Sequence, residues 1–417
     1  MSATTSSGAP QTTPDRSLFD GVLRPDPTDP RRTNAYLATP TVQSHASILA
    51  TLPDGDLGMV WFGGTQEGVG DISIWFARLG RDADRWSEPR RLTDDPSRSE
   101  QNPILFTTPT GALWLLYTAQ RAGNQDTAEV RRRISTDSGR SWGPVQTLFP
   151  ADEQSGVFVR QPVVVSGSGR WLIGIFRCVT VPGEPWSGDA DTSAVMISDD
   201  QGASWREVAV PDSVGAVHMN IVDLGRQEDG HGRLLALYRS RWADHIYASR
   251  SSDDGDTWTA PAPTALPNNN SSIQQCRLAD GRLGLIFNNS SRLDATQRRL
   301  SLYDEIDDEG LIEGATAAAA SVVEDDPDED RRRAFWGAPR APMTLAFSAD
   351  DGATWQVAGN LDEGDGYCLT NNSRDGLNRE LSYPAIHQSA DGTLHLSYTY
   401  HRQTIKHVQV PADWRPT

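Results

Sequence analysis

The sequence predicts an all-β fold, a six-bladed β-propeller with four-stranded antiparallel blades. One observation is a set of six segments, each an apolar strand, a glycine-containing turn and a second apolar strand, which mostly follow one another at intervals of roughly fifty to sixty residues. A repeat of that length suits one propeller blade, and a seventh blade stays open as an alternative. The other observation is the pattern Ser-x-Asp-x-Gly-x-Ser/Thr-Trp, which occurs at Ser135–Trp142, Ser198–Trp205, Ser251–Trp258 and Ser348–Trp355.

The repeated pattern, the Asp box, is typical of a tight turn. Asp supplies local hydrogen bonds, Gly supplies a positive φ, and the Trp that follows opens the next strand and packs against the blade. Catalytic residues occur once, whereas this Asp occurs four times, so we assign it no catalytic or metal-binding role. We expect no metal and no cofactor.

The six strand–turn–strand segments are expected to form the inner parts of the blades. Five of them lead into a turn that ends in Trp, and the first of these turns, at Trp86, is degenerate. The sixth has no such turn, so residues ahead of His45 are expected to supply its outer strand and close the ring. The segments are His45–Gly64, Asn102–Tyr117, Gln161–Phe176, His218–Tyr238, Ser271–Phe287 and Ser382–Tyr400.

The domain organisation follows from these segments. Residues 1–34 are expected to be a partly disordered N-terminal tail, residues 35–410 a single propeller domain, and residues 411–417 a C-terminal tail. The fifth unit carries a charged insertion at about 290–339. Within it, the stretch Asp304–Arg333 is expected to be a surface excursion rather than a blade, because it has few apolar residues to bury.

Composition limits the partners. The formal net charge of −18 argues against nucleic acid and anionic membranes, and no apolar run is long enough to span a bilayer. Three cysteines lack metal-ligand spacing, and the N-terminus lacks the features of a signal peptide, so a cytoplasmic location is expected. An acidic ligand would have to be met by local Arg residues.

Beyond the Asp boxes, five segments resemble the sialidase (neuraminidase) superfamily of BNR-repeat propellers, over about Ala35 to Val410. In particular they resemble a bacterial and fungal branch that includes lyases cleaving rhamnose from glucuronate. The segments are WFGGTQEG (Trp61–Gly68), QNPILF (Gln101–Phe106), PNNNSS (Pro267–Ser272), ELSYPAI (Glu380–Ile386) and YTYHRQTIKHV (Tyr398–Val408).

The resemblance implies several site residues. A sialidase of the usual pattern grips the substrate carboxylate with three Arg residues and attacks with a Tyr that is paired with a Glu. Tyr383 matches that Tyr, Arg239 or Arg241 matches the Arg of blade four, and Arg340 matches the third Arg.

The departures from that pattern are equally specific. His45 stands where the first Arg is expected, and His218 with Asn220 stands where the paired Glu is expected. Either Glu67 or Asp71 lies near the place of the acid Asp. A neutral His can accept a proton near pH 7, which suggests that proton transfer has replaced part of the anion binding.

Propeller sites lie at the central channel, so polar residues at the starts of the inner strands are the candidates. Arg is the side chain best suited to bidentate pairing with a carboxylate. The catalytic candidates are His45, Tyr383, Glu67 and His218. The substrate-binding candidates are Arg160, Arg239, Arg241, Arg340, Asn102, Gln161, Asn220 and Asn270.

These residues favour an enzyme that cleaves a terminal linkage in an acidic oligosaccharide or glycan. The favoured reaction is β-elimination at a uronate, with Arg and Asn neutralising the carboxylate, His45 as base and Tyr383 as acid. One alternative is an exo-sialidase-type hydrolase with Tyr383 as nucleophile. Another is a glycan-binding propeller without catalysis. The sequence leaves the sugar, the linkage and the oligomeric state open.

Overall fold

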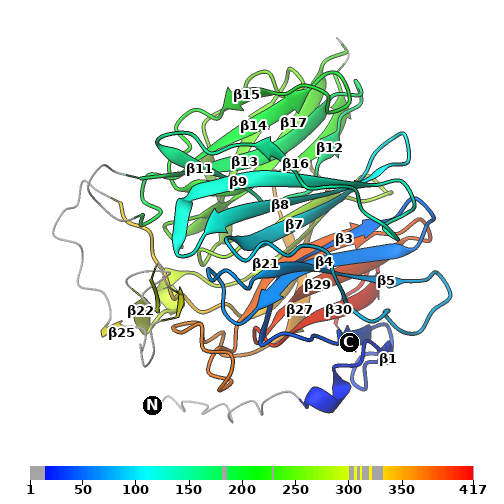
Figure 1. The fold of residues 1–417 in the computed structure, drawn as a ribbon. Helices are drawn as coiled ribbons and strands as arrows, with labels where there is room; N and C mark the ends of the chain where they lie inside the picture. The colour runs from blue at the N-terminus through cyan, green and yellow to red at the C-terminus, as the bar shows by residue number, and fades with distance from the viewer. Residues whose placement is uncertain are drawn as a thin grey trace, which may run out of the picture.

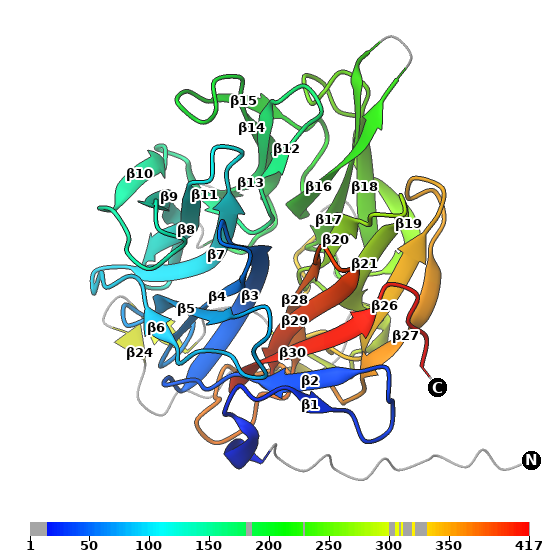
Figure 2. The same ribbon diagram turned by 90° about the vertical axis from the view of Figure 1, so that its right-hand side faces the viewer.

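The described part of the chain is a ring of six antiparallel sheets (Figure 1). A computed structural model describes residues 15–180, 186–227, 230–299, 305–307, 310–311, 319–321 and 332–416. The inner strands of the blades lie around the middle of the view in Figure 2. The predicted six-bladed propeller is therefore confirmed. Among the described residues, no helix is long and apolar enough to cross a membrane.

Each blade is a meander whose strands run from the channel outward. Blade one has β3 (Gln43–Thr51), β4 (Leu57–Gly64), β5 (Ser73–Leu79) and β6 (Arg90–Arg91). Blade two has β7 (Ser99–Thr107), β8 (Leu113–Arg121), β9 (Asn124–Ser135) and β10 (Gln146–Phe149). Blade three has β11 (Ser155–Val159) with β12 (Val164–Val165), then β13 (Trp171–Val179), β14 (Thr192–Ser198) and β15 (Arg206–Ala209).

The second half of the ring repeats this plan. Blade four has β16 (Ala216–Arg226), β17 (Gly232–Ser240), β18 (His245–Ser251) and β19 (Ala262–Pro267). Blade five has β20 (Gln274–Arg277), β21 (Leu283–Asn288), β26 (Met343–Ser348) and β27 (Gln356–Asp362). Blade six has β28 (Leu381–Gln388), β29 (Thr393–Tyr400), β30 (Thr404–Pro411), β2 (Thr33–Tyr36) and β1 (Arg24–Pro25).

Blade six is completed by the N-terminal part of the chain. β2 pairs with β30 as an antiparallel neighbour, and the blue strand lies beside the red one in Figure 2. The predicted ring closure is thus confirmed. The expected domain start at residue 35 falls inside β2, and the described residues before it carry β1 and the short helix η1 (Arg16–Leu18). At the other end, Trp414 is 1% exposed in the core of blade six and donates to Asp29.

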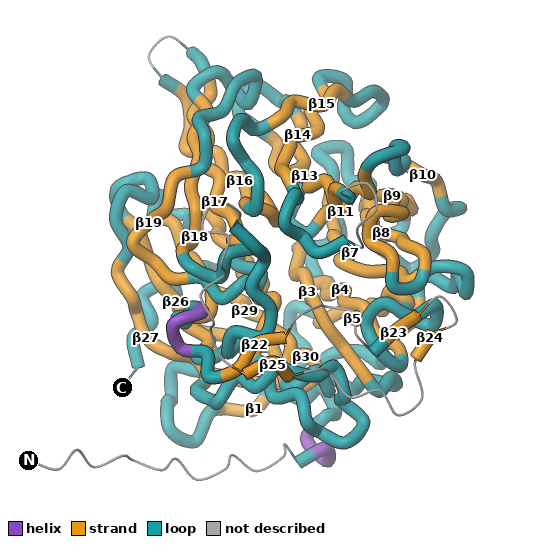
Figure 3. The backbone as a smooth tube through the Cα atoms, turned by 90° about the vertical axis from the view of Figure 1, so that its left-hand side faces the viewer, coloured by secondary structure: helices purple, strands orange, loops and turns teal. Residues whose placement is uncertain are grey.

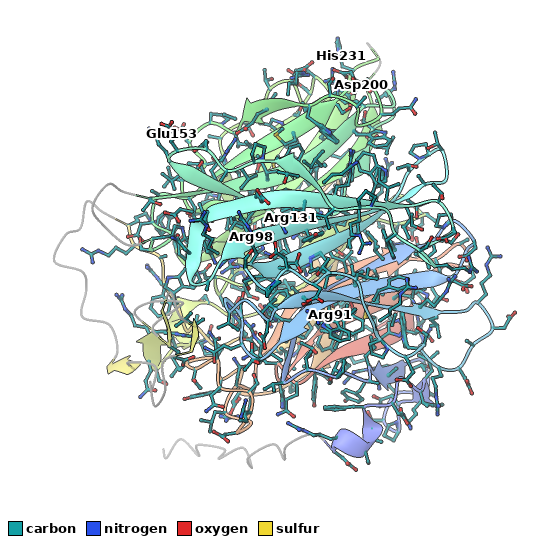
Figure 4. The ribbon with its side chains drawn as sticks, viewed as in Figure 1. Arg91, Arg98, Arg131, Glu153, Asp200 and His231 are labelled. Atoms are coloured by element: carbon teal, nitrogen blue, oxygen red, sulfur yellow. The ribbon has the colours of Figure 1, made fainter. Side chains whose placement is uncertain are left out.

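The four Asp boxes share one hydrogen-bond pattern. In the first box, Asp137 accepts from the hydroxyls of Ser135 and Ser141 and from the backbone N–H of Ser141, and Ser135 Oγ accepts from Gly139 N–H. Hydrogen bonds from Ser204 lower the pKa of Asp200, the equivalent residue of the second box, to about 2. Figure 4 shows Asp200 near the edge of the molecule. The Asp of each box uses its carboxylate oxygens for hydrogen bonds within its own turn, as the sequence predicts.

The box glycines also lock each blade to the preceding one. A Cβ on Gly202 would lie 2.5 Å from Trp114 of blade two, and one on Gly255 would lie 2.5 Å from Leu172 of blade three. Both glycines have a positive φ, so any larger residue would meet both backbone strain and a clash. The Asp box therefore fixes the spacing between neighbouring blades as well as the turn.

The insertion in blade five lies between β21 and β26. Its described part holds the short helix η2 (Arg292–Asp294) and two strand pairs that are not hydrogen-bonded into any blade sheet (Figures 1 and 3). The pairs are β22 (Gln297–Arg299) with β25 (Ala319–Ser321) and β23 (Ile306–Asp307) with β24 (Gly310–Leu311). Most of Asp304–Arg333, the predicted excursion, lies outside the described residues. No four-stranded sheet occurs in the described part of the insertion.

Packing at the box supports a stability prediction. Trp258 is 6% exposed, packs in the core between blades three and four, and donates its Nε1–H to Gly255 O. We expect Trp258→Ala to lower the free energy of unfolding by about 3–5 kcal/mol, because it opens a cavity in that core. Urea unfolding checks the loss, and activity per folded molecule should stay that of the wild type. A variant that is stable but inactive would contradict the structural role.

A chain of neutral imidazoles crosses blade six. Trp86 Nε1–H donates to His407 Nδ1, so the proton of His407 is on Nε2, which faces His395 Nδ1 at 3.1 Å. His395 Nε2 then donates to Ser389 Oγ. Burial lowers the pKa of His395 to about 4 and lowers that of His407 well below its usual range. Every ring nitrogen has a partner only while both rings are neutral.

This chain predicts acid sensitivity. In the unfolded chain a His titrates near about 6.5, so between that pH and about 4 the unfolded state binds more protons than the folded state. Stability should therefore fall as the pH falls through this window. We expect the urea midpoint of the wild type to drop more between pH 7 and pH 4.5 than that of His395→Gln. Equal drops would exclude the His pair as the cause.

Candidate active site

A repeated β-bulge shapes the channel end of the inner strands. In blades one, two, four and six the inner strand carries one extra residue relative to its neighbour at the same place in the register. The extra length comes with a left-handed residue of positive φ, which is strained for a side chain other than Gly. A bulge re-aims the side chains beside it. The left-handed residues are Ala46, Asn102, His218 and Tyr383.

Three of these four side chains enter a small cavity at the channel mouth. Ala46 of blade one is the exception, because it has no polar group to contribute. The predicted site residues that line the cavity are Glu67, Asn102, His218, Arg239, Arg241, Arg340 and Tyr383. Gln101, Gln125, Phe158, Phe176, Trp336 and Arg402 complete the wall.

Tyr383 stands at the centre of the wall. Its hydroxyl accepts a hydrogen bond from Arg239 Nη1 at 2.5 Å, and the same nitrogen lies 3.3 Å from His218 Nε2. Its ring packs 4.2 Å from the ring of His45 and lies under the guanidinium of Arg340 at 5.7 Å. Among the described residues no carboxylate bonds to the Tyr383 hydroxyl.

A chain of buried ion pairs runs along one side of the cavity. Arg402 donates from Nη1 to Glu67 and from Nε to Glu380, both at 2.7 Å. Glu380 also accepts from Arg340 Nη1 at 3.2 Å and from Ser382 Oγ at 2.6 Å. All four charged residues are less than 9% exposed. The chain joins the loop after β4, the entry to β26, the entry to β28 and the β29–β30 turn.

The protonation states follow from burial and from the local charges. Burial would raise the pKa of Glu380, but Arg402, Arg340 and the Ser382 hydroxyl outweigh it and hold that pKa at about 2. Burial, reinforced by Arg239 and Arg241, lowers the pKa of His218 well below its usual range. Glu380 is therefore ionised and His218 neutral near pH 7. Because Arg239 donates to His218 Nε2, the proton of the imidazole is on Nδ1.

Two arginines from blade four have different partners. Arg241 donates from Nε and Nη2 to Asp191 Oδ2 at 3.0 and 2.6 Å, and it stacks on Trp336 at 5.1 Å. Arg239 has neutral partners: Asn270 Oδ1 accepts from its Nε at 2.7 Å. Burial lowers the pKa of Arg239 to about 9. A cation without a carboxylate partner in such a wall is suited to bind an anion.

Four predicted binding residues lie behind or below the cavity wall. Arg160 donates to the backbone carbonyls of Ser47 and Tyr383 and so ties blade six to blade one. Gln161 bonds to Ile273 O and Asn220 accepts from Gln275 N–H, which cross-links inner strands deeper in the channel. Asn270 holds Arg239 and Arg340 from behind. The geometry gives these residues hydrogen bonds within the protein and no place in the wall.

His45 differs most from its predicted place. Its ring is fully buried behind Tyr383, its Nδ1 lies 2.7 Å from Thr399 Oγ1, and it is not part of the cavity wall. Burial, reinforced by Arg402 and Arg340, lowers its pKa well below the usual range. At the bulge of blade one the ring of His45 packs behind Tyr383, and the left-handed residue that follows it, Ala46, is itself buried in the core. His45 therefore cannot contact a ligand in the cavity, and the geometry does not support the catalytic role predicted for it.

Sequence reasoning did not select Arg402 or Glu380 as site residues. Both stand in segments that carried the family resemblance, ELSYPAI and YTYHRQTIKHV, and that was the available signal. It also missed Trp336, which the insertion supplies, and Asp191. No sequence pattern marks these two. Among the described residues, no group of three His, Cys, Asp or Glu side chains is placed to hold a metal ion.

Comparison with known proteins defines the family. The model of the BNR repeat-like domain matches residues 55–396. The chain belongs to the BNR repeat-like family. A comparison with curated protein sequences finds no match. Three solved structures share the fold of this chain.

The solved structures share the propeller at low sequence identity. The Hadza microbial sialidase Hz136 is 14% identical with a TM-score of 0.61, and the match covers 89% of this chain and 66% of that one. A Dyadobacter fermentans protein of unknown function is 16% identical with a TM-score of 0.62 over 94% and 98%. The intramolecular trans-sialidase from Ruminococcus gnavus is 12% identical with a TM-score of 0.60 over 91% and 96%. This BNR repeat-like chain therefore has the sialidase-type fold.

The ion-pair chain yields a prediction. Glu380→Gln leaves two buried guanidiniums facing each other without the carboxylate between them. Removing one partner of a buried pair costs about 3–5 kcal/mol, and we expect a loss of that order in urea unfolding. Glu153→Gln is the control, because Glu153 is exposed at the periphery in Figure 4. An unchanged midpoint for Glu380→Gln would show that the chain does not hold the site together.

Proposed function

We propose that this BNR repeat-like protein is a glycan-processing enzyme that cleaves the terminal linkage of a uronate-containing oligosaccharide by β-elimination. The proposal builds on the sialidase-type fold, on the positive cavity in an otherwise acidic chain, and on the groups that surround Tyr383. Four guanidiniums line the cavity, those of Arg239, Arg241, Arg340 and Arg402, against the three carboxylates of Asp191, Glu67 and Glu380, and both His rings are neutral. This local excess of positive charge favours an acidic sugar.

The substrate carboxylate has a suitable partner in Arg239. Nε and Nη1 of Arg239 are held by Asn270, Tyr383 and His218, whereas its Nη2 has no hydrogen-bond partner among the described residues. The Nδ1–H of His218 has no partner either. Two donors of this kind can neutralise the carboxylate at C6 and so make the proton on C5 more acidic. Asn102 Oδ1, also without a partner, can accept from a sugar hydroxyl.

Glu67 and Tyr383 supply the base and the acid. Arg402 holds one oxygen of Glu67, and the other, Oε1, has no hydrogen-bond partner in the described chain. In the proposed step Glu67 takes the C5 proton, the electron pair of the C5–H bond forms the C4–C5 double bond, and the C4–O4 bond breaks. The Tyr383 hydroxyl gives its proton to O4, and Arg239 stabilises the phenolate that results. Proton transfer from Glu67 to Tyr383, through solvent, restores both groups.

The observation that carries the proposal is the set of polar neighbours of the Tyr383 hydroxyl. A phenol needs a carboxylate or another base beside it to act as a nucleophile. Here the hydroxyl bonds to Arg239, next to a His218 whose free nitrogen carries a proton. These donors stabilise the phenolate that forms when the Tyr383 hydroxyl gives its proton to O4. They therefore favour Tyr383 as an acid.

Hydrolysis by a sialidase-type route is the second candidate. Its support is that Arg239, Arg340 and Arg402 all line the cavity around Tyr383, a trio of cations like the one the family resemblance leads us to expect. In this trio Arg402 would stand in for the missing first Arg. The two candidates differ in their products, because elimination leaves an unsaturated uronate and hydrolysis leaves a saturated sugar.

The test is product analysis on oligosaccharides that carry a sugar on O4 of a uronate and on sialate-terminated oligosaccharides. We expect a new ultraviolet absorbance, from the conjugated double bond, with the uronate substrates. Tyr383→Phe and Glu67→Gln should each lower kcat by about 10²- to 10⁴-fold, the usual contribution of an acid or a base. Asp71→Asn is the matched control, since Asp71 is an exposed carboxylate of the same loop that bonds to Thr65. A saturated product would establish hydrolysis, and no turnover on any substrate would favour a binding protein.

A further inference from the structure

An open groove lies beside the cavity, between blade one and the linker from blade six into β3. Its free volume is about 1080 Å³, against about 360 Å³ for the cavity. The linker residues 38–42 form one wall. Trp75 of β5 and Phe19 supply aromatic rings, and Arg16, Arg374 and Gln403 supply polar groups. The proposed reaction uses none of these residues.

Two chain segments, the β29–β30 turn and the linker before β3, connect the groove to the cavity wall. Arg402 and Gln403 are neighbours in the β29–β30 turn, where Arg402 lines the cavity and Gln403 lines the groove. The linker residues before β3 line the groove, and the side chain of Gln43 that follows them accepts from Glu67 N–H at 3.0 Å. The wall of the cavity and the wall of the groove are therefore built in part from the same two segments.

Trp75 is positioned as a stacking surface. Its indole N–H donates to Gly63 O at 3.2 Å, which fixes the ring and leaves no unsatisfied polar group. The ring is half-buried, so part of it stays open to the groove. The apolar faces of pyranose rings pack well on a flat, rigid aromatic surface of this kind, because stacking buries apolar area and costs little side-chain entropy.

The charges of the groove fit an acidic chain. Arg374 is exposed and has no hydrogen bond or ion pair with another described residue. Arg16 donates to the neutral amide of Gln403 at 3.3 Å and has no carboxylate partner among the described residues. Glu88 is the one acidic residue of the wall. In a chain with a net charge of −18, two unneutralised guanidiniums beside an aromatic ring favour a ligand that carries carboxylates.

We infer that this groove binds the sugar units beyond the cleaved linkage of an acidic oligosaccharide, with Trp75 stacking on a pyranose ring and Arg374 and Arg16 pairing with uronate carboxylates. The inference rests on the proposed function, because it takes the uronate at the cleaved linkage to lie in the cavity. It makes the enzyme select for chain length: a longer uronate oligosaccharide binds both regions, and a disaccharide binds the cavity alone.

The experiment compares kcat/KM on a disaccharide in which a sugar is linked to O4 of a uronate and on a hexasaccharide that ends in the same disaccharide. Trp75→Ala and Arg374→Ala should each lower kcat/KM on the hexasaccharide by roughly tenfold, equivalent to about 1.4 kcal/mol, and leave the disaccharide value unchanged. Trp75→Phe should recover most of the loss. Arg81→Ala is the control, since Arg81 is an exposed arginine beyond the far end of β5. Equal losses on both substrates, or no loss on the hexasaccharide, would overturn the inference.

A binding measurement separates this inference from the reaction. The Trp75 indole N–H signal of the wild-type protein is followed by NMR while the hexasaccharide is added. A shift of that signal that is lost in Arg374→Ala supports the groove even if no product forms, in which case the proposed function alone fails. An unshifted signal under conditions where the hexasaccharide is cleaved overturns the groove and leaves the function standing.

Discussion

Glu380 is the carboxylate on which the rest of the site depends. Two buried guanidiniums, Arg340 and Arg402, share it, and Arg402 continues the chain of charges to Glu67. Taking such ions out of water is expensive, and each is tolerable only while its partners stay in place. The chain therefore couples blades one, five and six, so that the cavity wall forms as one unit or not at all. Whatever ligand binds there finds its cations already oriented.

A shared backbone irregularity gives this wall its chemical variety. The same one-residue bulge occurs in four inner strands, and in three of them its left-handed residue reaches the cavity. The fold sets the place of the left-handed residue, and its side chain sets the chemical group found there. Asn102 and His218 supply hydrogen-bonding groups and Tyr383 supplies a hydroxyl, whereas Ala46 supplies no polar group. Strain on the order of 1 kcal/mol at each left-handed residue is tolerated because the sheets on either side hold it in place.

The sequence predicted the ring well and the site less well. The Asp boxes and strand pairs are local signals, so the blade count, the turn chemistry and the closing strand ahead of His45 could all be read from the chain. The site depends on which side of a bulge a residue occupies. At these bulges His45 stays buried behind Tyr383, whereas Asn102 and His218 reach the cavity.

Other parts of the site had no local signal. Arg402 belongs to a hairpin turn whose polar residues look like ordinary surface residues, and Trp336 arrives from the far end of the insertion. Their positions depend on contacts between segments distant in the sequence, such as Arg402 with Glu67 and Trp336 with Arg241. Pairing of this kind follows from the closed ring, which has to be known before the contacts can be inferred.

The pairing of β2 with β30 has a consequence for biosynthesis. β2 is synthesised before blades one to five, and its partner β30 is synthesised after them. Blades one to five can assemble in turn from strands that are close in sequence, whereas blade six has to wait until β30 has been synthesised. Until then the edge of β2 is unpaired and open to wrong partners, which makes the interval before the ring closes the time of greatest risk of aggregation.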